Sequence, residues 1–272
     1  MSTTPPAALP AELLAAALRR SAATPLLTSY DDATDERVEL SAATLANWVA
    51  KTANLLQDEC DVGPGSTVAL ALPVHWQTAA VLLGAWSCGA AVLDTALEDE
   101  GRAAGADVVL AAQERLPALA EAVGDASATE LWGLSLHPLG LGMTGYAGPA
   151  RDFAVEVRGH GDVFFPHQDP DPADPGLVVG GASLTLGSLG ATAAELAERL
   201  GLIDGDRVLV DERTAEEAGP VAWLLAPLAA GASIVLCRNA DPDRLAARVA
   251  TERVTATFGV RVDGVRTLGA PA

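Results

Sequence analysis

The sequence predicts an α/β protein built from two related, stacked subdomains with mostly parallel sheets. Short apolar segments, typical of buried strands, alternate along the chain with longer segments whose apolar residues recur at helical spacing. This alternation is typical of a doubly wound parallel sheet. It runs through residues 1–136 and again through residues 177–272, and residues 137–176 between them are rich in Gly, Pro and Asp. We therefore expect two α/β subdomains joined by a linking segment.

The first expected subdomain opens with a helix and a β-hairpin. Leu13, Leu14 and Leu18 share one side of a helix over Pro10–Arg20, and the acidic turn Asp31–Glu36 separates the two hairpin strands. The strands and helices from the hairpin onward are expected at Pro25–Tyr30, Arg37–Leu40, residues 42–59 after the N-cap Ser41, Thr67–Leu72, Trp76–Ser87, Ala90–Leu93, Asp107–Ala111, Leu116–Val123 and Glu130–Leu136.

The second expected subdomain shows the same alternation. Asp241 and Pro242 form an N-cap and first-turn pair that fixes the start of its last helix. Its elements are expected, strand and helix in turn, at Leu177–Val179, Leu189–Leu200, Arg207–Val210, Val221–Ala229, Ser233–Leu236, Pro242–Arg253 and Thr255–Phe258.

The two subdomains share an internal pattern. Ser41–Leu93 and Ser188–Leu236 each contain a helix, a glycine turn, a strand, a second helix, the dipeptide Gly-Ala and a closing strand. Any βαβ unit can show a glycine after its helix, but the shared order favours a structural repeat. We expect the two segments to superpose with parallel strand pairs. A crevice between such subdomains is where α/β folds usually bind ligands.

Composition excludes several classes of function. The formal net charge of −19 opposes binding to nucleic acid or to an anionic membrane surface. Lys51 is the only lysine, and the three cysteines are too scattered for a disulfide framework or a zinc site. The uncharged stretches Val62–Leu93 and Gly219–Cys237 are interrupted by Pro and Gly, which disfavours a membrane-spanning helix. With no signal-peptide pattern at its start, the chain is expected to be cytoplasmic.

Several segments resemble acyl-adenylate-forming (AMP-binding) enzymes, which include acyl-CoA synthetases, peptide-synthetase adenylation domains and luciferases. In chain order they are Leu40–Ala50, Val62–Pro73, Gly84–Val92, Leu97–Glu100, Leu196–Leu209, Leu224–Val235 and Arg253–Gly259. The resemblance implies part of the large N-terminal domain of this superfamily, as a truncated member. We expect a family of short chains from GC-rich bacteria.

The resemblance does not extend to the superfamily's catalytic motifs. A Thr/Ser/Gly-rich loop ending in Pro-Lys-Gly should lie between Leu177–Val179 and Leu189, but the interval Gly180–Ser188 is short and contains no lysine. The chain also ends before the adenine-binding motif, the metal-binding Thr-Glu, the ribose-binding Asp and the C-terminal Lys. Phosphate chemistry requires charge neutralisation by Lys, Arg or Mg²⁺. The resemblance thus implies the fold without the adenylation activity.

A few residues remain as candidate ligand-binding groups. Gly180 and Gly181, after a strand, could present backbone amides to an anion, with hydroxyls from Ser183 and Thr185; a tight turn with a helix cap explains the same residues. His75 follows a strand end, where a cleft residue would lie. We expect no catalytic residue, no metal site and no cofactor, because the sequence lacks the motifs that would support binding of ATP, AMP or CoA.

These observations favour a catalytically degenerate protein that binds a partner protein or a small acyl or nucleotide ligand. The alternative is one half of a split acyl-adenylating enzyme, an AMP-dependent synthetase or ligase completed by another chain. A third reading is a reduced enzyme with different chemistry in the crevice. A homodimer is also expected, since the apolar strand-like segments Val254–Phe258 and Val260–Leu268 would leave a sheet edge bare.

Overall fold

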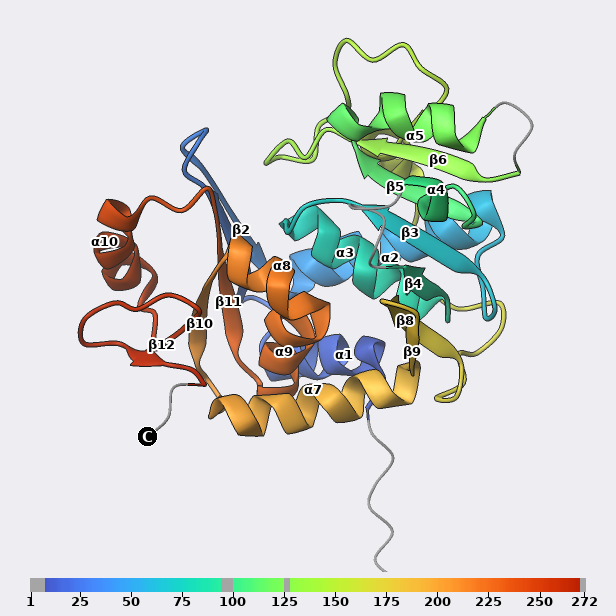
Figure 1. Cartoon of the computed structure of the whole chain (residues 1–272). Coiled ribbons are helices and arrows are strands. Elements are labelled where there is room, and N and C mark those ends of the chain that lie inside the picture. Colours follow the sequence, from blue (N-terminus) through green and yellow to red (C-terminus); the bar gives the residue numbers. More distant parts are fainter. Residues whose placement is uncertain (1–7, 94–99, 125–127, 270–272) are drawn as a thin grey trace, which may run out of the picture. The chain divides into compact units, whose positions relative to one another are not determined.

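The computed structural model describes residues 8–93, 100–124 and 128–269 (Figure 1). These residues form two compact α/β units, each with its own sheet. Unit 1 comprises Met1–Ala46, Val74–Trp76 and Ser188–Ala272, and unit 2 comprises Asn47–Pro73 and Gln77–Gly187. The units therefore differ from the predicted boundaries at residues 136 and 177, because both ends of the chain contribute to unit 1.

Unit 1 contains a six-stranded sheet with the strand order β13-β12-β10-β11-β1-β2. All neighbouring strands are parallel except the hairpin pair β1 and β2. In chain order its strands are β1 (Pro25–Asp31), β2 (Glu36–Ser41), β10 (Arg207–Asp211), β11 (Ser233–Arg238), β12 (Ala256–Phe258) and β13 (Arg266–Thr267).

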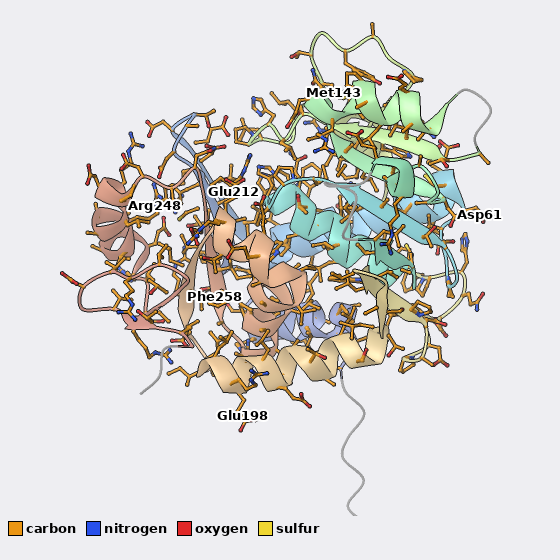
Figure 2. The ribbon with its side chains drawn as sticks, in the orientation of Figure 1. Asp61, Met143, Glu198, Glu212, Arg248 and Phe258 are labelled. Carbon is orange, nitrogen blue, oxygen red and sulfur yellow. The ribbon has the colours of Figure 1, made fainter. Side chains whose placement is uncertain are left out.

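Helices cover both faces of this sheet. Helix α10 (Pro242–Glu252) places Leu245 against Leu209 and Val235 on one face. On the other face, α7 (Leu186–Leu200) and α9 (Ala226–Ala230) pack against Val208 and Ala256. The remaining helical elements of unit 1 are α1 (Pro10–Arg20), the start of α2 (Ala42–Cys60), α8 (Glu212–Pro220) and the π-turn η3 (Val221–Leu225). Glu198 marks the solvent side of α7 (Figure 2).

The N-terminal hairpin explains why the predicted boundaries were different. Strand β1 pairs in parallel with β11, with Leu27 opposite Ile234 and Ser29 opposite Leu236. Without this pairing, β11 would be an edge strand with exposed backbone groups. Alternation along a sequence indicates which segments are strands, but it does not indicate which sheet a strand joins.

Unit 2 contains a seven-stranded sheet with the order β7-β6-β5-β3-β4-β8-β9. Only the pair β8 and β9 is antiparallel. In chain order the strands are β3 (Thr67–Ala71), β4 (Ala91–Leu93), β5 (Val108–Ala112), β6 (Glu130–Leu134), β7 (Arg151–Asp152), β8 (Pro175–Val179) and β9 (Ala182–Thr185).

Helices also cover the sheet of unit 2. Helices α4 (Glu100–Ala103) and α5 (Leu116–Val123) pack against β3, β5 and β6, and Met143 lies at the same cluster (Figure 2). Helices α2 and α3 (Trp76–Ser87) lie close together, since a side chain at Gly84 would contact Thr52 at 2.9 Å. The short helical elements η1 (Gln113–Arg115), α6 (Phe153–Glu156) and η2 (Val157–Gly159) complete the unit.

The predicted linking segment, residues 137–176, belongs to unit 2 in the structure. It contributes β7, α6, η2 and the start of β8. The Asp152 carboxylate accepts a hydrogen bond from the Val155 amide and thereby caps α6. The Gly, Pro and Asp content of this segment indicated its irregular backbone but not its place beside β6.

The repeated order of elements is confirmed in both units. The predicted parallel strand pairs are β3 with β4 and β10 with β11. The helix between β10 and β11 differs from the predicted Val221–Ala229, because α8 begins nine residues earlier at Glu212. Gly219, with φ of 74°, and Pro220 then interrupt the helical path before η3. Within the described residues, no helix combines the length and apolarity needed to cross a membrane.

Candidate functional site

The predicted glycine pair lies at the tip of a β-hairpin in unit 2. Gly180 and Gly181 have φ values of 55° and 85° and connect β8 to β9, with Val179 opposite Ala182. Two positive φ values in a two-residue loop are the geometry of a type I′ turn, which favours glycine. The predicted helix Leu189–Leu200 is confirmed as α7, which begins at Leu186, but strand β9 between the turn and α7 was not predicted.

The hydroxyl candidates lie on β9. Ser183 is exposed and pairs with Val178, and the half-buried Thr185 pairs with Pro175. The first amides of α7 are already used: Leu186 N–H donates to Asp174 O and Gly187 N–H to Pro172 O, both at 2.9 Å. These are two of the four amides that a helix N-terminus offers to an anion. The start of α7 therefore binds its own chain.

His75 belongs to unit 1, whereas the glycine hairpin belongs to unit 2. Its side chain is 5 % exposed. Burial, assisted by the positive charge of Arg238, lowers the pKa of His75 to about 3. The imidazole is thus neutral at physiological pH. The structure does not bring His75 and the hairpin residues together in one unit.

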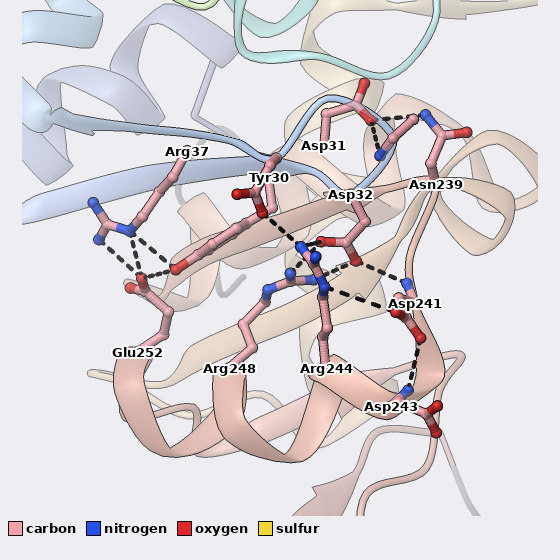
Figure 3. Close-up of polar contacts among 12 residues, drawn as sticks. Tyr30, Asp31, Asp32, Arg37, Asn239, Asp241, Asp243, Arg244, Arg248 and Glu252 are labelled. Carbon is pink, nitrogen blue, oxygen red and sulfur yellow. Dashed lines mark hydrogen bonds and ion pairs between the residues drawn. The ribbon is translucent and has the colours of Figure 1, made fainter.

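An extended polar cluster lies in unit 1, between the β1–β2 hairpin and α10 (Figure 3). At one end, Glu252 of α10 accepts hydrogen bonds from the Tyr30 hydroxyl at 2.5 Å, Arg37 Nε at 2.9 Å and Arg207 Nη2 at 2.5 Å. Burial raises the pKa of Glu252, but these hydrogen bonds outweigh it and lower the pKa overall. Glu252 therefore remains a carboxylate that its own neighbours satisfy.

At the other end of the cluster, Arg248 and Asp32 form a bidentate ion pair. Arg248 Nη2 lies 2.5 Å from Asp32 Oδ1, and Nη1 lies 3.1 Å from Oδ2. The two side chains are 5 % and 4 % exposed, and the Asp241 amide donates to the same carboxylate at 2.7 Å. The Arg248 guanidinium also lies over the Tyr30 ring, 4.1 Å from its centroid. Figure 3 shows these side chains converging from the hairpin and from α10.

The cluster is built to hold elements together rather than to move a proton. Arg238 continues it by pairing with Asp31 at 3.3 Å and with Glu212 at 3.0 Å. Each buried carboxylate is paired with an arginine, and a general base would instead need a pKa near the working pH. No group of three His, Cys, Asp or Glu side chains in the described part of the chain is placed to hold a metal ion.

Comparison with known proteins identifies the family. No protein-family model matches the chain. A protein of Mycobacterium tuberculosis (strain ATCC 25618 / H37Rv), described as a TIGR03089 family protein, is 48% identical over 257 residues, which cover 93% of this chain and 98% of that relative. The chain belongs to the TIGR03089 family.

Solved structures show which fold this TIGR03089 chain has. A Mycobacterium tuberculosis fatty acyl CoA synthetase matches with a TM-score of 0.72 at 15% identity, over 92% of this chain and 49% of that one. The anthranilate CoA ligase AuaEII, solved with anthranoyl-AMP, matches with a TM-score of 0.72 at 18% identity, over 94% and 50% of the two chains. The N-terminal domain of FACL13 from Mycobacterium tuberculosis matches with a TM-score of 0.71 at 15% identity, over 93% and 62%.

The TIGR03089 chain therefore has the α/β fold of the N-terminal domain of acyl-CoA synthetases, and the predicted resemblance is confirmed at the level of fold. It spans about half the length of the full synthetase structures. At these identities the likeness establishes the fold alone.

Sequence reasoning missed the charged cluster of the TIGR03089 chain, although a signal was present. Leu245, Arg248, Val249 and Glu252 recur at spacings of three and four, so they share one face of α10. Two charged residues on a face that packs against a sheet indicate buried partners. The partners themselves, Asp32 and Tyr30, lie more than 200 residues away in the chain.

Proposed function

We propose that this TIGR03089 family chain is a non-catalytic relative of adenylate-forming enzymes that acts by binding a partner protein or a small acyl or nucleotide ligand. One observation carries the proposal. The resemblance places a lysine-containing phosphate loop between β8 and α7, but the chain has there a two-residue glycine turn and strand β9, with no Lys or Arg between Leu177 and Leu189.

Two cations of unit 2, Lys51 and Arg151, support this proposal because carboxylates already neutralise them. Lys51 lies 2.9 Å from Asp162 and also donates to the His160 carbonyl. Arg151 pairs with both Glu59 and Glu156 at 2.9 Å. Phosphoryl and adenylyl transfer depend on cations that stabilise charge developing in the transition state. With a formal charge of −19, the chain as a whole also repels a polyphosphate.

The test is carboxylate-dependent exchange of pyrophosphate into ATP. The purified chain is assayed with Mg²⁺ and a panel of aliphatic, aromatic and amino-acid carboxylates, with an active acyl-CoA synthetase as the positive control. We expect no exchange above that of heat-inactivated protein with any carboxylate. Exchange that is above this background and saturates with one carboxylate would overturn the non-catalytic assignment.

The second candidate function is one half of a split AMP-dependent ligase. The chain spans about half the length of the synthetase structures, which favours this alternative. The exchange assay separates the two proposals when it is repeated on protein isolated from its native cells together with its co-purifying proteins. Exchange that requires both the chain and one of those proteins supports the split enzyme. If neither preparation shows exchange, the result supports the proposal of a non-catalytic binding protein.

A further inference from the structure

The β8–β9 turn that carries the proposed function belongs to unit 2, whereas unit 1 contains a small pocket of its own. Its volume is about 210 Å³, and its lining includes Ala17, Arg20, Thr24, Leu26, Asp206 and Gly231. Residues 205–206, 231–233 and 24–26 lie at the amino ends of β10, β11 and β1. Open α/β sheets usually bind ligands at the opposite edge, where the carboxyl ends of the strands lie. The pocket is therefore distinct from the site expected for this fold.

Arg20, in the last turn of α1, supplies the positive charge of the pocket. Its side chain is 49% exposed, and its Nε lies 3.5 Å from Asp204 Oδ1. Within the described residues, neither of its two terminal nitrogens has a hydrogen-bond partner, so both can donate to a ligand. A guanidinium with two parallel N–H groups matches the geometry of a carboxylate.

Gly231 makes room for this guanidinium. A side chain at Gly231 would approach Arg20 Nη2 to 2.5 Å and Asp204 Oδ1 to 2.3 Å. The residue also adopts a φ of 77° at the end of α9, a conformation that favours glycine. Both constraints keep the floor of the pocket beneath Arg20 free of a side chain.

The rest of the lining is apolar, with a few neutral hydroxyls. Ala17, Leu26 and Ala42 are each less than 10 % exposed. Asp206 adds no free negative charge, because its carboxylate accepts hydrogen bonds from the Ile203 amide, Thr255 and Arg266. The pocket thus offers a ligand the two terminal nitrogens of Arg20, whose Nε pairs with the exposed Asp204, and a short apolar wall.

We propose that this pocket binds a small monocarboxylate, with its carboxylate on Arg20 and its aliphatic chain against Ala17 and Leu26. The volume lies below the roughly 300–1,000 Å³ of pockets for drug-sized ligands, so the pocket is too small for a nucleotide or an acyl-CoA. Asp204 competes with the ligand for Arg20, and binding exchanges this exposed ion pair for one with the ligand.

The experiment is an NMR titration of the labelled full chain with butyrate, and with butyramide as an uncharged ligand of the same shape. We expect butyrate to shift the amides of Ala17, Gly205 and Gly231 with a dissociation constant on the order of millimolar, as suits so few ligand atoms. Butyramide should bind at least about tenfold more weakly, because it lacks the charge that Arg20 recognises. No nucleotide is present, so the result is independent of the exchange assay.

Three variants make the test specific. Arg20→Gln should abolish the shifts, whereas the matched control Arg19→Gln, an exposed neighbour outside the lining, should retain them. Asp204→Asn removes the competing carboxylate and should tighten butyrate binding about threefold, a gain that a folding defect cannot produce. The proposal would be overturned if the amide shifts did not saturate with butyrate, if butyramide bound as tightly as butyrate, or if the Arg20→Gln variant bound butyrate fully.

Discussion

The buried pair of Arg248 and Asp32 decides how firmly α10 is held to the N-terminal hairpin. Arg248→Ala would leave the Asp32 carboxylate, 4 % exposed, without its main partner. Removing one member of such a pair costs about 3–5 kcal/mol of unfolding free energy. Urea denaturation at pH 7 measures this loss as a lower midpoint with an unchanged slope.

Arg244 provides the matched control for that variant. It lies one turn earlier on α10 and approaches the same Asp32 carboxylate at 3.6 Å, but it is 48% exposed. Arg244→Ala should therefore leave the urea midpoint nearly unchanged. The double variant Asp32→Leu/Arg248→Met, which removes both buried charges, should regain most of the loss. Equal losses for the two arginine variants would contradict a special role for the buried pair.

His75 should make the stability of the protein depend on pH. Burial lowers the pKa of His75 to about 3 in the folded state, from an ordinary value of 6.5. As the pH falls below 6.5, the unfolded chain takes up a proton at this residue and the folded chain does not. The free energy of unfolding should therefore fall by about 1.4 kcal/mol per pH unit between pH 6 and 4.5.

Urea midpoints across this pH range measure that slope. His75→Asn should flatten it, because asparagine does not titrate, while His167→Asn, which changes an exposed histidine, should preserve it. A slope that His75→Asn leaves unaltered would show that other groups cause the pH dependence. The sequence indicated that His75 follows a strand end, but its pKa also depends on the charge of Arg238, a residue from a distant part of the chain.

At the scale of elements, the β8–β9 turn tests whether glycine is required by backbone conformation alone. A side chain at Gly180 or Gly181 would meet nothing within 4 Å, so only the positive φ values restrict these positions. Gly181→Ala should therefore cost about 1 kcal/mol of hairpin stability, and amide exchange in β8 and β9 should rise about fivefold. In the Gly180→Asn variant, the amides of β8 and β9 should exchange at nearly the wild-type rate, since Asn-Gly suits a type I′ turn. Equal effects of the two substitutions would count against this explanation.

Most elements could be predicted from the sequence because their signals are local. The helix over Pro10–Arg20 and the order of strands and helices in both units were confirmed. Strand β9 was missed because Ala182–Thr185 is only four residues long, although its apolar and polar residues alternate. The start of α8 was missed because its polar sequence carries few apolar residues at helical spacing; its N-cap, Asp211, was the available signal.

At the scale of the whole molecule, contacts between distant segments were beyond sequence reasoning. Residues 1–46 and 188–272 form one unit because β1 pairs with β11. The expected bare edge at Val254–Phe258 is partly covered, since β13 pairs in parallel with β12. On the other edge of the same sheet, β2 carries Glu36, Arg37 and Glu39, charges that discourage pairing with another chain.

Exposed apolar side chains are a better reason to expect a homodimer than the bare sheet edge that the sequence suggested. The described part of unit 2 has four apolar side chains that are 64–77 % exposed, namely Leu139, Val155, Val163 and Phe165. The backbone around two of them is fixed, because Asn54 and Gln57 of α2 donate hydrogen bonds to the carbonyls of residues 161, 163 and 165. A fixed segment that presents Val163 and Phe165 to solvent is typical of an interaction surface. A symmetric contact through it needs no second gene product.

We therefore expect light scattering at micromolar concentration to return twice the 27.7 kDa chain mass. Phe165→Asp should shift the protein toward monomer, because a carboxylate would be buried at the contact. Ile203→Asp changes a side chain of unit 1 that is 61 % exposed, and this control should remain dimeric. A monomer at every concentration would refute the dimer. A dimer that Ile203→Asp disrupts and Phe165→Asp does not would place the contact on unit 1, as the C-terminal strands first suggested.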